Sequence, residues 1–143
     1  MFMGEFAHNI DRKGRLILPA KFHDELGEKV IVNRGLDGCL SVYTMAQWAI
    51  EYQKIASLPS TNKDARMFQR FYLAKASEVE LDSQGRILIP ASLIKEAGLV
   101  KECLIIGVAN HLEIWSKDKW NALEEEQMGS FETYAENLSG FME

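Results

Sequence analysis

The chain has 143 residues, of which 47% are apolar and 26% charged, and its formal net charge is −5. This is the composition of an ordinary globular domain, and it excludes intrinsic disorder, collagen-like repeats and a small disulfide scaffold. The longest apolar run, 103–109, is too short to span a bilayer. The first ten residues hold Glu5 but no lysine or arginine, so no signal peptide is visible and we expect a cytoplasmic protein. Cys39 and Cys103 are then expected to be reduced, buried thiols.

The net charge hides an asymmetry between the two halves. Residues 1–75 hold 11 basic and 8 acidic residues, whereas residues 76–143 hold 5 basic and 13 acidic residues. The halves therefore carry +3 and −8, in agreement with the total of −5. Because net charge governs solubility and long-range steering, and not the contacts of one patch, it does not exclude a nucleic-acid partner.

The N-terminal half begins with a strand, a tight turn and a second strand. Phe6 and Ile10 mark the first strand, and Asp11-x-x-Gly14 is a turn signal with aspartate at the first corner and glycine at the fourth. The aliphatic run 16–18 then indicates a short buried strand. Downstream we expect a helix over 20–26 between Pro19 and Gly27, strands over 30–32 and 40–43, and a helix capped by Thr44 that carries Trp48.

A break at 58–61 separates this half from a further helix. Thr61 with Asp64 resembles a capping box, with aspartate in the usual glutamate position. The apolar face of that helix consists of Ala65, Phe68 and Tyr72. Its basic stripe consists of Lys63, Arg66 and Arg70. This stripe is either a solvated face or a salt-bridged contact with the acidic tail of a neighbouring subunit.

The second half repeats the first at an offset of 71 residues. Between 11–20 and 82–91, five of ten positions are identical and three more are apolar in both copies. After one inserted residue the offset becomes 72. The second copy should therefore contain a strand at Val79 and Leu81, a turn, a strand over 87–89, a helix over 91–97 stopped by Gly98, strands over 104–106 and 112–115, and a helix capped by Ser116 that carries Trp120. The tail that follows is acidic, with Phe131, Tyr134 and Leu138 at helical spacing.

The repeat predicts how the chain is organised. One copy offers four short strands, which are hard to stabilise alone. Two copies can interleave and close into one barrel, which removes exposed sheet edges. We therefore expect an α+β fold made of one duplicated domain over 1–143. Its expected parts are repeat one over 5–52, a helical connection over 53–73, repeat two over 74–124 and an acidic helical tail over 125–143.

The residues do not favour an enzyme. Asp11 and Asp82 resemble the paired carboxylates of aspartic proteases, but each lies four residues from an arginine that favours the ionised form and opposes proton sharing. His8, His23 and His111 have no metal-ligand spacing. No phosphate loop or nucleophile elbow is present. We expect no catalytic residue, no metal and no cofactor.

The duplicated turn does offer a binding group, because an arginine follows it in each copy. Arg15 and Arg86 project at the lip of a sheet, and the planar fork of an arginine suits phosphate or the O6/N7 edge of guanine. The first copy adds Arg12, Lys13 and, beyond the strand, Lys21. An alternative stays open, in which each arginine pairs internally with the aspartate of its own turn.

The sequence resembles a known protein family along essentially its whole length. The resemblance lies in Asp11-x-x-Gly14-Arg15-Leu-x-Leu-Pro19-Ala20 and Asp82-x-x-Gly85-Arg86-Ile-x-Ile-Pro90-Ala91, with Thr61-x-Lys63-Asp64-Ala65-Arg66 and Arg70-Phe71. This doubled motif is similar to that of the MraZ family of bacterial transcriptional regulators. A single copy would point only to the wider AbrB-like superfamily, whose members form the same barrel from two chains.

The resemblance implies a double-split β-barrel and a DNA-binding repressor of the division and cell-wall gene cluster. It also implies a ring-shaped homo-oligomer in the cytoplasm, on the nucleoid, bound to double-stranded promoter DNA with short G-rich direct repeats. The family's DNA contacts are ascribed to its Asp-x-x-x-Arg motifs. Carried onto this sequence, these contacts fall to Arg15 and Arg86, with support from Lys13 and Arg12.

The two motifs are not expected to contribute equally. Ser83 and Gln84 stand where the first copy has Arg12 and Lys13, so the second motif is poorer in charge. We therefore predict that Arg15 contributes more than its counterpart. Since one small barrel makes few contacts, several subunits in a ring would bind tandem repeats together and gain avidity.

Two other functions stay open at this stage. An antitoxin-like protein of the same fold would repress its own promoter and bind a basic toxin through its acidic tail. An oligomeric scaffold would pair its arginines internally and would not bind DNA.

Overall fold

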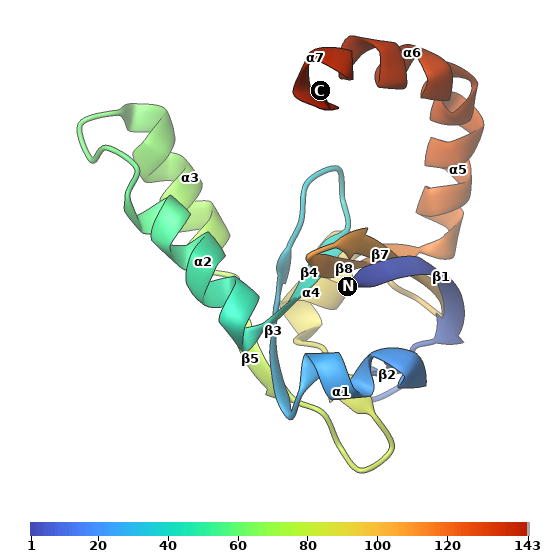
Figure 1. The fold of residues 1–143 in the computed structure, drawn as a ribbon. Helices are drawn as coiled ribbons and strands as arrows, with labels where there is room; N and C mark the ends of the chain where they lie inside the picture. The colour runs from blue at the N-terminus through green and yellow to red at the C-terminus, as the bar shows by residue number, and fades with distance from the viewer. Residues whose placement is uncertain (143) are drawn as a thin grey trace.

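The computed structural model of the protein describes residues 1–142. Its strands are β1 (Phe2–Asn9), β2 (Arg15–Ile17), β3 (Lys29–Arg34), β4 (Leu40–Thr44), β5 (Ser77–Glu80), β6 (Arg86–Leu88), β7 (Glu102–Ala109) and β8 (His111–Ser116). Its helices are η1 (Ala20–Phe22), α1 (His23–Leu26), α2 (Met45–Ala56), α3 (Lys63–Leu73), α4 (Ala91–Ala97), α5 (Lys117–Gln127), η2 (Met128–Ser130), α6 (Phe131–Asn137) and α7 (Ser139–Met142). Two helical arms, α2–α3 and α5–α7, extend from a central group of strands (Figure 1).

The strands form two antiparallel sheets in which the two copies are interleaved. The larger sheet has the order β1-β7-β8-β4-β3-β5, and the smaller sheet pairs β2 with β6. The pairs β1–β7, β3–β5, β4–β8 and β2–β6 each join one copy to the other. Among the described strands, only the hairpins β3–β4 and β7–β8 pair within a copy. The α+β class is confirmed, and the double-split barrel stays a prediction because the two sheets are separate hydrogen-bonded units.

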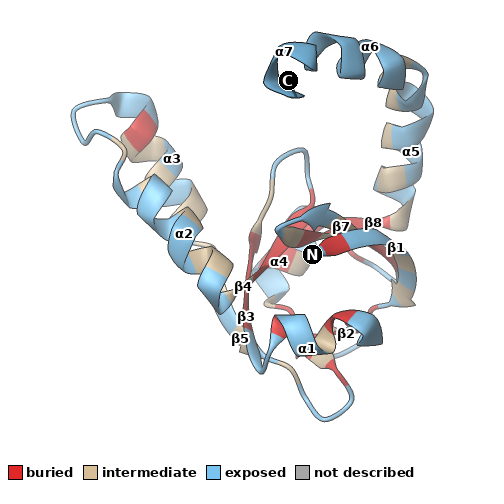
Figure 2. Ribbon diagram, viewed as in Figure 1, coloured by how far each residue is buried: buried red, intermediate tan, exposed pale blue. Residues whose placement is uncertain are grey.

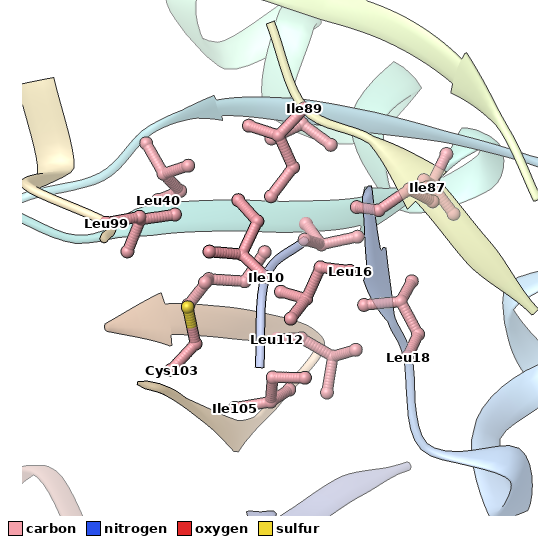
Figure 3. Close-up of a cluster of buried hydrophobic side chains, with 14 of the residues drawn as sticks. Ile10, Leu16, Leu18, Leu40, Ile87, Ile89, Leu99, Cys103, Ile105 and Leu112 are labelled. Atoms are coloured by element: carbon pink, nitrogen blue, oxygen red, sulfur yellow. The ribbon is translucent and has the colours of Figure 1, made fainter. Parts of the chain in front are cut away.

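The two motif strands supply the middle of the hydrophobic core. Leu16 on β2 and Ile87 on β6 are fully buried, and Leu18 and Ile89 follow them into the interior. Figure 3 shows these side chains converging with residues from the larger sheet, among them Ile105. Burial of one such side chain stabilises the fold by about 1.5–3 kcal/mol. The core therefore depends on both copies of the motif at once.

The short helices after the motif strands form where proline and glycine predict them. Pro19 and Pro90 stand at the N-caps of η1 and α4. Gly27 and Gly98 are the C-caps of α1 and α4 with positive φ, as an ending helix favours. In the first copy the expected helix is divided into a 3-10 turn and a short α-helix.

The arm α2–α3 is a helical hairpin, and its second helix begins one residue later than expected. Thr44 caps α2 by accepting a hydrogen bond from the Gln47 amide at 3.0 Å. The cap of α3 is Asn62, whose side chain accepts from the Ala65 amide at 3.0 Å. The predicted capping box at Thr61 is therefore wrong, because the amide oxygen of Asn62 occupies the N-cap position and Thr61 lies outside the helix.

Both arms start from the outer face of the larger sheet in equivalent ways. Trp48 on α2 packs against Tyr43 with ring centroids 5.9 Å apart, and Trp120 on α5 packs against Trp115 at 5.4 Å. Beyond these contacts both arms are largely exposed (Figure 2). Among the described residues, no helix combines the length and apolarity that crossing a membrane requires.

Candidate nucleic-acid interface

The first motif is a turn that its own aspartate holds closed. One carboxylate oxygen of Asp11 accepts hydrogen bonds from the amides of Lys13 at 2.9 Å and Arg15 at 2.8 Å. The Gly14 amide donates to the Asp11 carbonyl at 3.0 Å. The hydrogen bond from the Arg15 amide is the largest cause that lowers the pKa of Asp11 from its ordinary value. The turn is therefore built for an ionised aspartate.

The second motif reproduces this geometry with different residues at its corners. Asp82 accepts from the amides of Gln84 and Arg86, both at 2.9 Å, and the Gly85 amide donates to the Asp82 carbonyl at 2.9 Å. The hydrogen bond from the Arg86 amide again lowers the pKa of the aspartate. Because these bonds use backbone amides, the turn tolerates Ser83 and Gln84 in place of two basic residues.

Each arginine is held by its turn aspartate through one nitrogen only. The Nε of Arg15 donates to Asp11 at 2.7 Å, and the Nε of Arg86 donates to Asp82 at 2.7 Å. Within residues 1–142, no hydrogen bond or ion pair involves the Nη groups of either side chain. Internal pairing therefore occurs, but it uses one of the five donors and leaves the outer edge of each fork available.

The register of the small sheet brings both arginines to one surface. Arg15 pairs with Leu88, and Ile17 pairs with Arg86, so the arginines stand at diagonal corners of the β2–β6 ribbon. Side chains of paired and alternate residues share one face of a sheet. The intervening residue of each strand faces the core, whereas Ile17 and Leu88 lie 39% and 56% exposed on the outer face with the arginines.

The two turns also hold each other in place. The Gly85 carbonyl accepts from the Leu18 amide at 3.0 Å, and the Gly14 carbonyl accepts from the Ile89 amide at 2.9 Å. Each motif therefore terminates the motif strand of the other copy. Consequently the positions of the two arginines are coupled through backbone hydrogen bonds.

Both glycines are required by backbone conformation and by close neighbours. The φ angles are +87° at Gly14 and +76° at Gly85, a region that favours glycine. A Cβ on Gly14 would lie 2.9 Å from Ile94, and a Cβ on Gly85 would overlap the ring of His23. These two neighbours occupy equivalent positions of the repeat. Each short helix therefore covers the turn of the other copy.

Sequence reasoning missed the role of His23, and likewise that of Ile94 at the other turn. Its Nε2 lies 2.7 Å from the Leu18 carbonyl, and its ring packs on Gly85. In the sequence, His23 has no neighbouring residue at the spacing of metal ligands, and no other pattern draws attention to it. The alignment of His23 with Ile94 is the signal that could have identified it, because both positions face a motif turn.

The extra positive charge of the first copy lies beside the ribbon. Arg12 and Lys13 are exposed and line a shallow hollow together with Gly14, Leu88 and the start of α4. The corresponding positions of the second copy are uncharged, so charge on this surface is concentrated at the first motif. Lys21 lies apart from this hollow, with its Nζ 5.5 Å and 5.4 Å from the ring centroids of two phenylalanines on β1 and η1.

Metal-ligating clusters and reactive thiols were the other chemistry that the sequence could offer. Over residues 1–142, no three histidine, cysteine or acidic side chains cluster where they could hold an ion. Glu113 lies beside Cys39, and burial, with a further contribution from Glu113, raises the pKa of Cys39 to about 12. Burial also raises the pKa of Cys103. Neither thiol is poised as a nucleophile.

We expect both thiols to resist alkylation in the folded protein. At mildly alkaline pH almost none of Cys39 is in the thiolate form that reacts. Both sulfurs are also buried, so the reagent has little access to them. Mass spectrometry after iodoacetamide treatment should show no added group on native protein and two added groups after unfolding in guanidinium. Rapid labelling of native Cys39 at the rate of free cysteine would contradict this prediction.

Comparison with known proteins places these motifs in a family. A family model described as "MraZ protein, putative antitoxin-like" matches residues 1–71 and again residues 72–141. The protein named transcriptional regulator MraZ of Ligilactobacillus salivarius (strain UCC118) is 52% identical over 141 residues, which cover 99% of this chain and 99% of that protein. Its namesake of Limosilactobacillus reuteri (strain DSM 20016) is 52% identical over 139 residues, covering 97% and 98%. Since the two family matches coincide with the two copies and the relatives align from end to end, the chain belongs to the MraZ family.

Proposed function

We propose that this protein is a DNA-binding transcriptional repressor of the division and cell-wall gene cluster that reads G-rich tandem direct repeats. The observation that carries the proposal is the outer face of the β2–β6 ribbon, where Arg15 and Arg86 stand at diagonal corners with their Nη groups unpaired among the described residues. Relatives that are 52% identical bear the name transcriptional regulator. This function needs no catalytic residue and no cofactor.

The chemistry of recognition follows from how the arginines are held. Asp11 and Asp82 bind the Nε of each guanidinium and so restrict its orientation before DNA arrives. The remaining donors form a fork that matches O6 and N7 of guanine in the major groove, which is wide enough for a two-stranded ribbon. Binding to DNA then costs less side-chain conformational entropy than it would for an unrestrained arginine. In this proposal, the Nη donors of Arg15 or Arg86 bind O6 and N7 of a guanine.

Phosphate contacts from the first motif would set the position of the protein on DNA. Lys13 and Arg12 are exposed beside the ribbon and would contact the phosphate backbone next to the first motif. Ser83 and Gln84 provide no such charge in the second copy. We therefore assign Arg15 the larger share of binding energy.

The proposal includes a ring-shaped homo-oligomer on the nucleoid, in the cytoplasm. One ribbon offers two arginines and a small surface, so a single subunit binds weakly. A ring engages tandem repeats together and raises affinity through effective concentration. We treat 1–143 as one duplicated domain in each subunit, because four strand pairs join one copy to the other.

A second candidate is an antitoxin-like protein that represses its own promoter and binds a toxin. It is favoured by the description of the family as antitoxin-like and by a C-terminal arm that carries exposed apolar side chains among glutamates. In that case a basic partner protein would cover the arm.

Recovery of genomic DNA fragments by the purified protein tests the proposal and finds the site. We expect enrichment of a promoter upstream of division and cell-wall genes, with several short G-rich direct repeats at constant spacing. Enrichment of a promoter next to a toxin gene, with that toxin bound to the purified protein, would favour the second candidate. Recovery of no specific fragment would refute both and leave an oligomeric scaffold.

A further inference from the structure

The C-terminal arm carries an apolar face that lies outside the core. From η2 onward its large apolar side chains are between 44% and 86% exposed. These side chains are Met128, Phe131, Tyr134, Leu138, Phe141 and Met142. From Met128 to Phe141 they recur every three or four residues, the spacing that places side chains on one side of a helical segment, along the successive helices η2, α6 and α7. Exposed apolar patches of this kind mark interaction surfaces, because contact of apolar side chains with water is unfavourable and a partner removes it.

Beyond Lys119 the charge of this arm has one sign only. Between residues 120 and 142 the sequence has no lysine or arginine. Its acidic residues are Glu124, Glu125, Glu126, Glu132 and Glu136. Where α5 meets α6, Trp120, Met128 and Phe131 line a mostly apolar hollow of about 160 Å³. This hollow is open at the surface, and its mostly apolar lining suits the ring of an aromatic side chain.

The helical hairpin α2–α3 is the complementary surface. Residues 45–75 contain five basic and two acidic residues. The stripe Lys63, Arg66 and Arg70 forms no ion pair within residues 1–142, since Arg66 donates to the Ser60 carbonyl and Arg70 to the Met67 sulfur. Phe71 stands beside this stripe with 57% of its surface exposed. The hairpin therefore offers positive charge and an aromatic side chain on one unpartnered surface.

We propose that residues 124–142, the acidic arm, of one subunit dock on residues 45–75, the hairpin, of the next subunit. The inference rests on the oligomer of the proposed function and names the surfaces that build it. In the structure the hairpin and the acidic arm leave the strands in different directions (Figures 1 and 2), so one subunit presents both surfaces at separate places. Such a head-to-tail contact joins two different surfaces and closes into a ring when its rotation allows.

The contact has a defined chemistry. Glu132 and Glu136, four residues apart on α6, pair with cations of the hairpin stripe. Phe71 enters the hollow between α5 and α6. The flanking apolar side chains of the two surfaces exclude water from these pairs, which strengthens them relative to exposed ion pairs.

Reversal of charge on each surface tests the contact in the absence of DNA. The arm variant carries Glu132→Lys and Glu136→Lys, and the hairpin variant carries Lys63→Glu and Arg70→Glu. Each alone places like charges against each other, so sedimentation should show a dissociation constant between subunits raised at least about tenfold. Phe71→Ser, which leaves every charge in place, should weaken assembly in the same direction.

Mixing the two charge variants in equal amounts is the decisive measurement. The basic arm of the arm variant then meets the acidic hairpin of the hairpin variant. The unmodified arm of the hairpin variant meets the unmodified hairpin of the arm variant, which is the natural contact. Native mass spectrometry should therefore recover assemblies in which the two variants alternate. A control with Glu28→Lys and Glu102→Lys changes net charge as the arm variant does, at exposed sites just before β3 and at the start of β7. It should assemble like the unmodified chain.

Outcomes for the contact and for the proposed function can be separated. An oligomer that persists in both charge variants would overturn the contact while leaving the ring and DNA binding intact. An unmodified chain that sediments as a monomer would overturn the contact and the ring together. Neither docking surface includes the motif arginines, so Arg15→Ala and Arg86→Ala in an otherwise unmodified chain test the ribbon while leaving the contact between subunits in place.

Discussion

Replacement of both Arg15 and Arg86 by alanine is expected to abolish specific binding to a fragment with G-rich tandem repeats. An arginine that reads guanine contributes about 1–3 kcal/mol, so its removal lowers affinity by roughly fivefold to more than a hundredfold. Arg15→Ala should cost more than Arg86→Ala, because only the first motif has Arg12 and Lys13 beside it. Gel-shift titration at fixed salt concentration measures both effects.

The controls for this prediction separate recognition from folding. Lys119→Ala removes an exposed cation on α5, outside the ribbon and its turns, and should leave affinity nearly unchanged. Arg15→Lys retains charge but lacks the planar fork, so it should lose discrimination between guanine and other bases more than overall affinity. Since the pairs with Asp11 and Asp82 are partly exposed, thermal stability should change little. Unaltered affinity in a folded, oligomeric double variant would refute the assignment of the site.

Leu16→Ala is expected to destabilise the protein by about 2–5 kcal/mol, a large share of the stability of a domain of this size. Leu16 is fully buried on β2 and pairs with the equally buried Ile87 of β6, so the cavity would open between the two copies of the motif. The same change would loosen the ribbon that presents the arginines. Urea denaturation at constant protein concentration measures the loss, because assembly also contributes to apparent stability.

The adjacent residue of the same strand provides the matched comparison. Ile17→Ala removes a similar side chain that is 39% exposed on the outer face, and it should cost less than about 1 kcal/mol. If both variants lose equal stability, then the assignment of one face of β2 to the core is incorrect.

Much of the local structure could be predicted because its causes lie within a few residues. Pro19 and Gly27, and again Pro90 and Gly98, mark the limits of the short helices in the structure as in the sequence. The strands expected from aliphatic runs are present, although β1 extends back to Phe2 because it pairs along the whole of β7. That extension depends on a partner in the other copy, which a local pattern does not reveal.

The N-cap of α3 was predicted one residue too early, which shows that local patterns are limited even at short range. Thr61 and Asn62 are adjacent and both can cap a helix. The structure uses Asn62, whose side chain reaches the Ala65 amide. Local propensity does not discriminate between two capping residues one position apart.

The sequence by itself determined the chemistry of each motif, because Asp, Gly and Arg interact within five consecutive residues and need no other part of the chain. It also determined that the chemistry occurs twice. Only the tertiary structure decided that Arg15 and Arg86 share one surface, since this follows from the antiparallel register of β2 with β6. The exchange of carbonyl hydrogen bonds between the turns, and the cover of Gly85 by His23, likewise require chain segments far apart in sequence to meet. Residues that interact across the copies are placed by strand pairing and core burial, which no local pattern encodes.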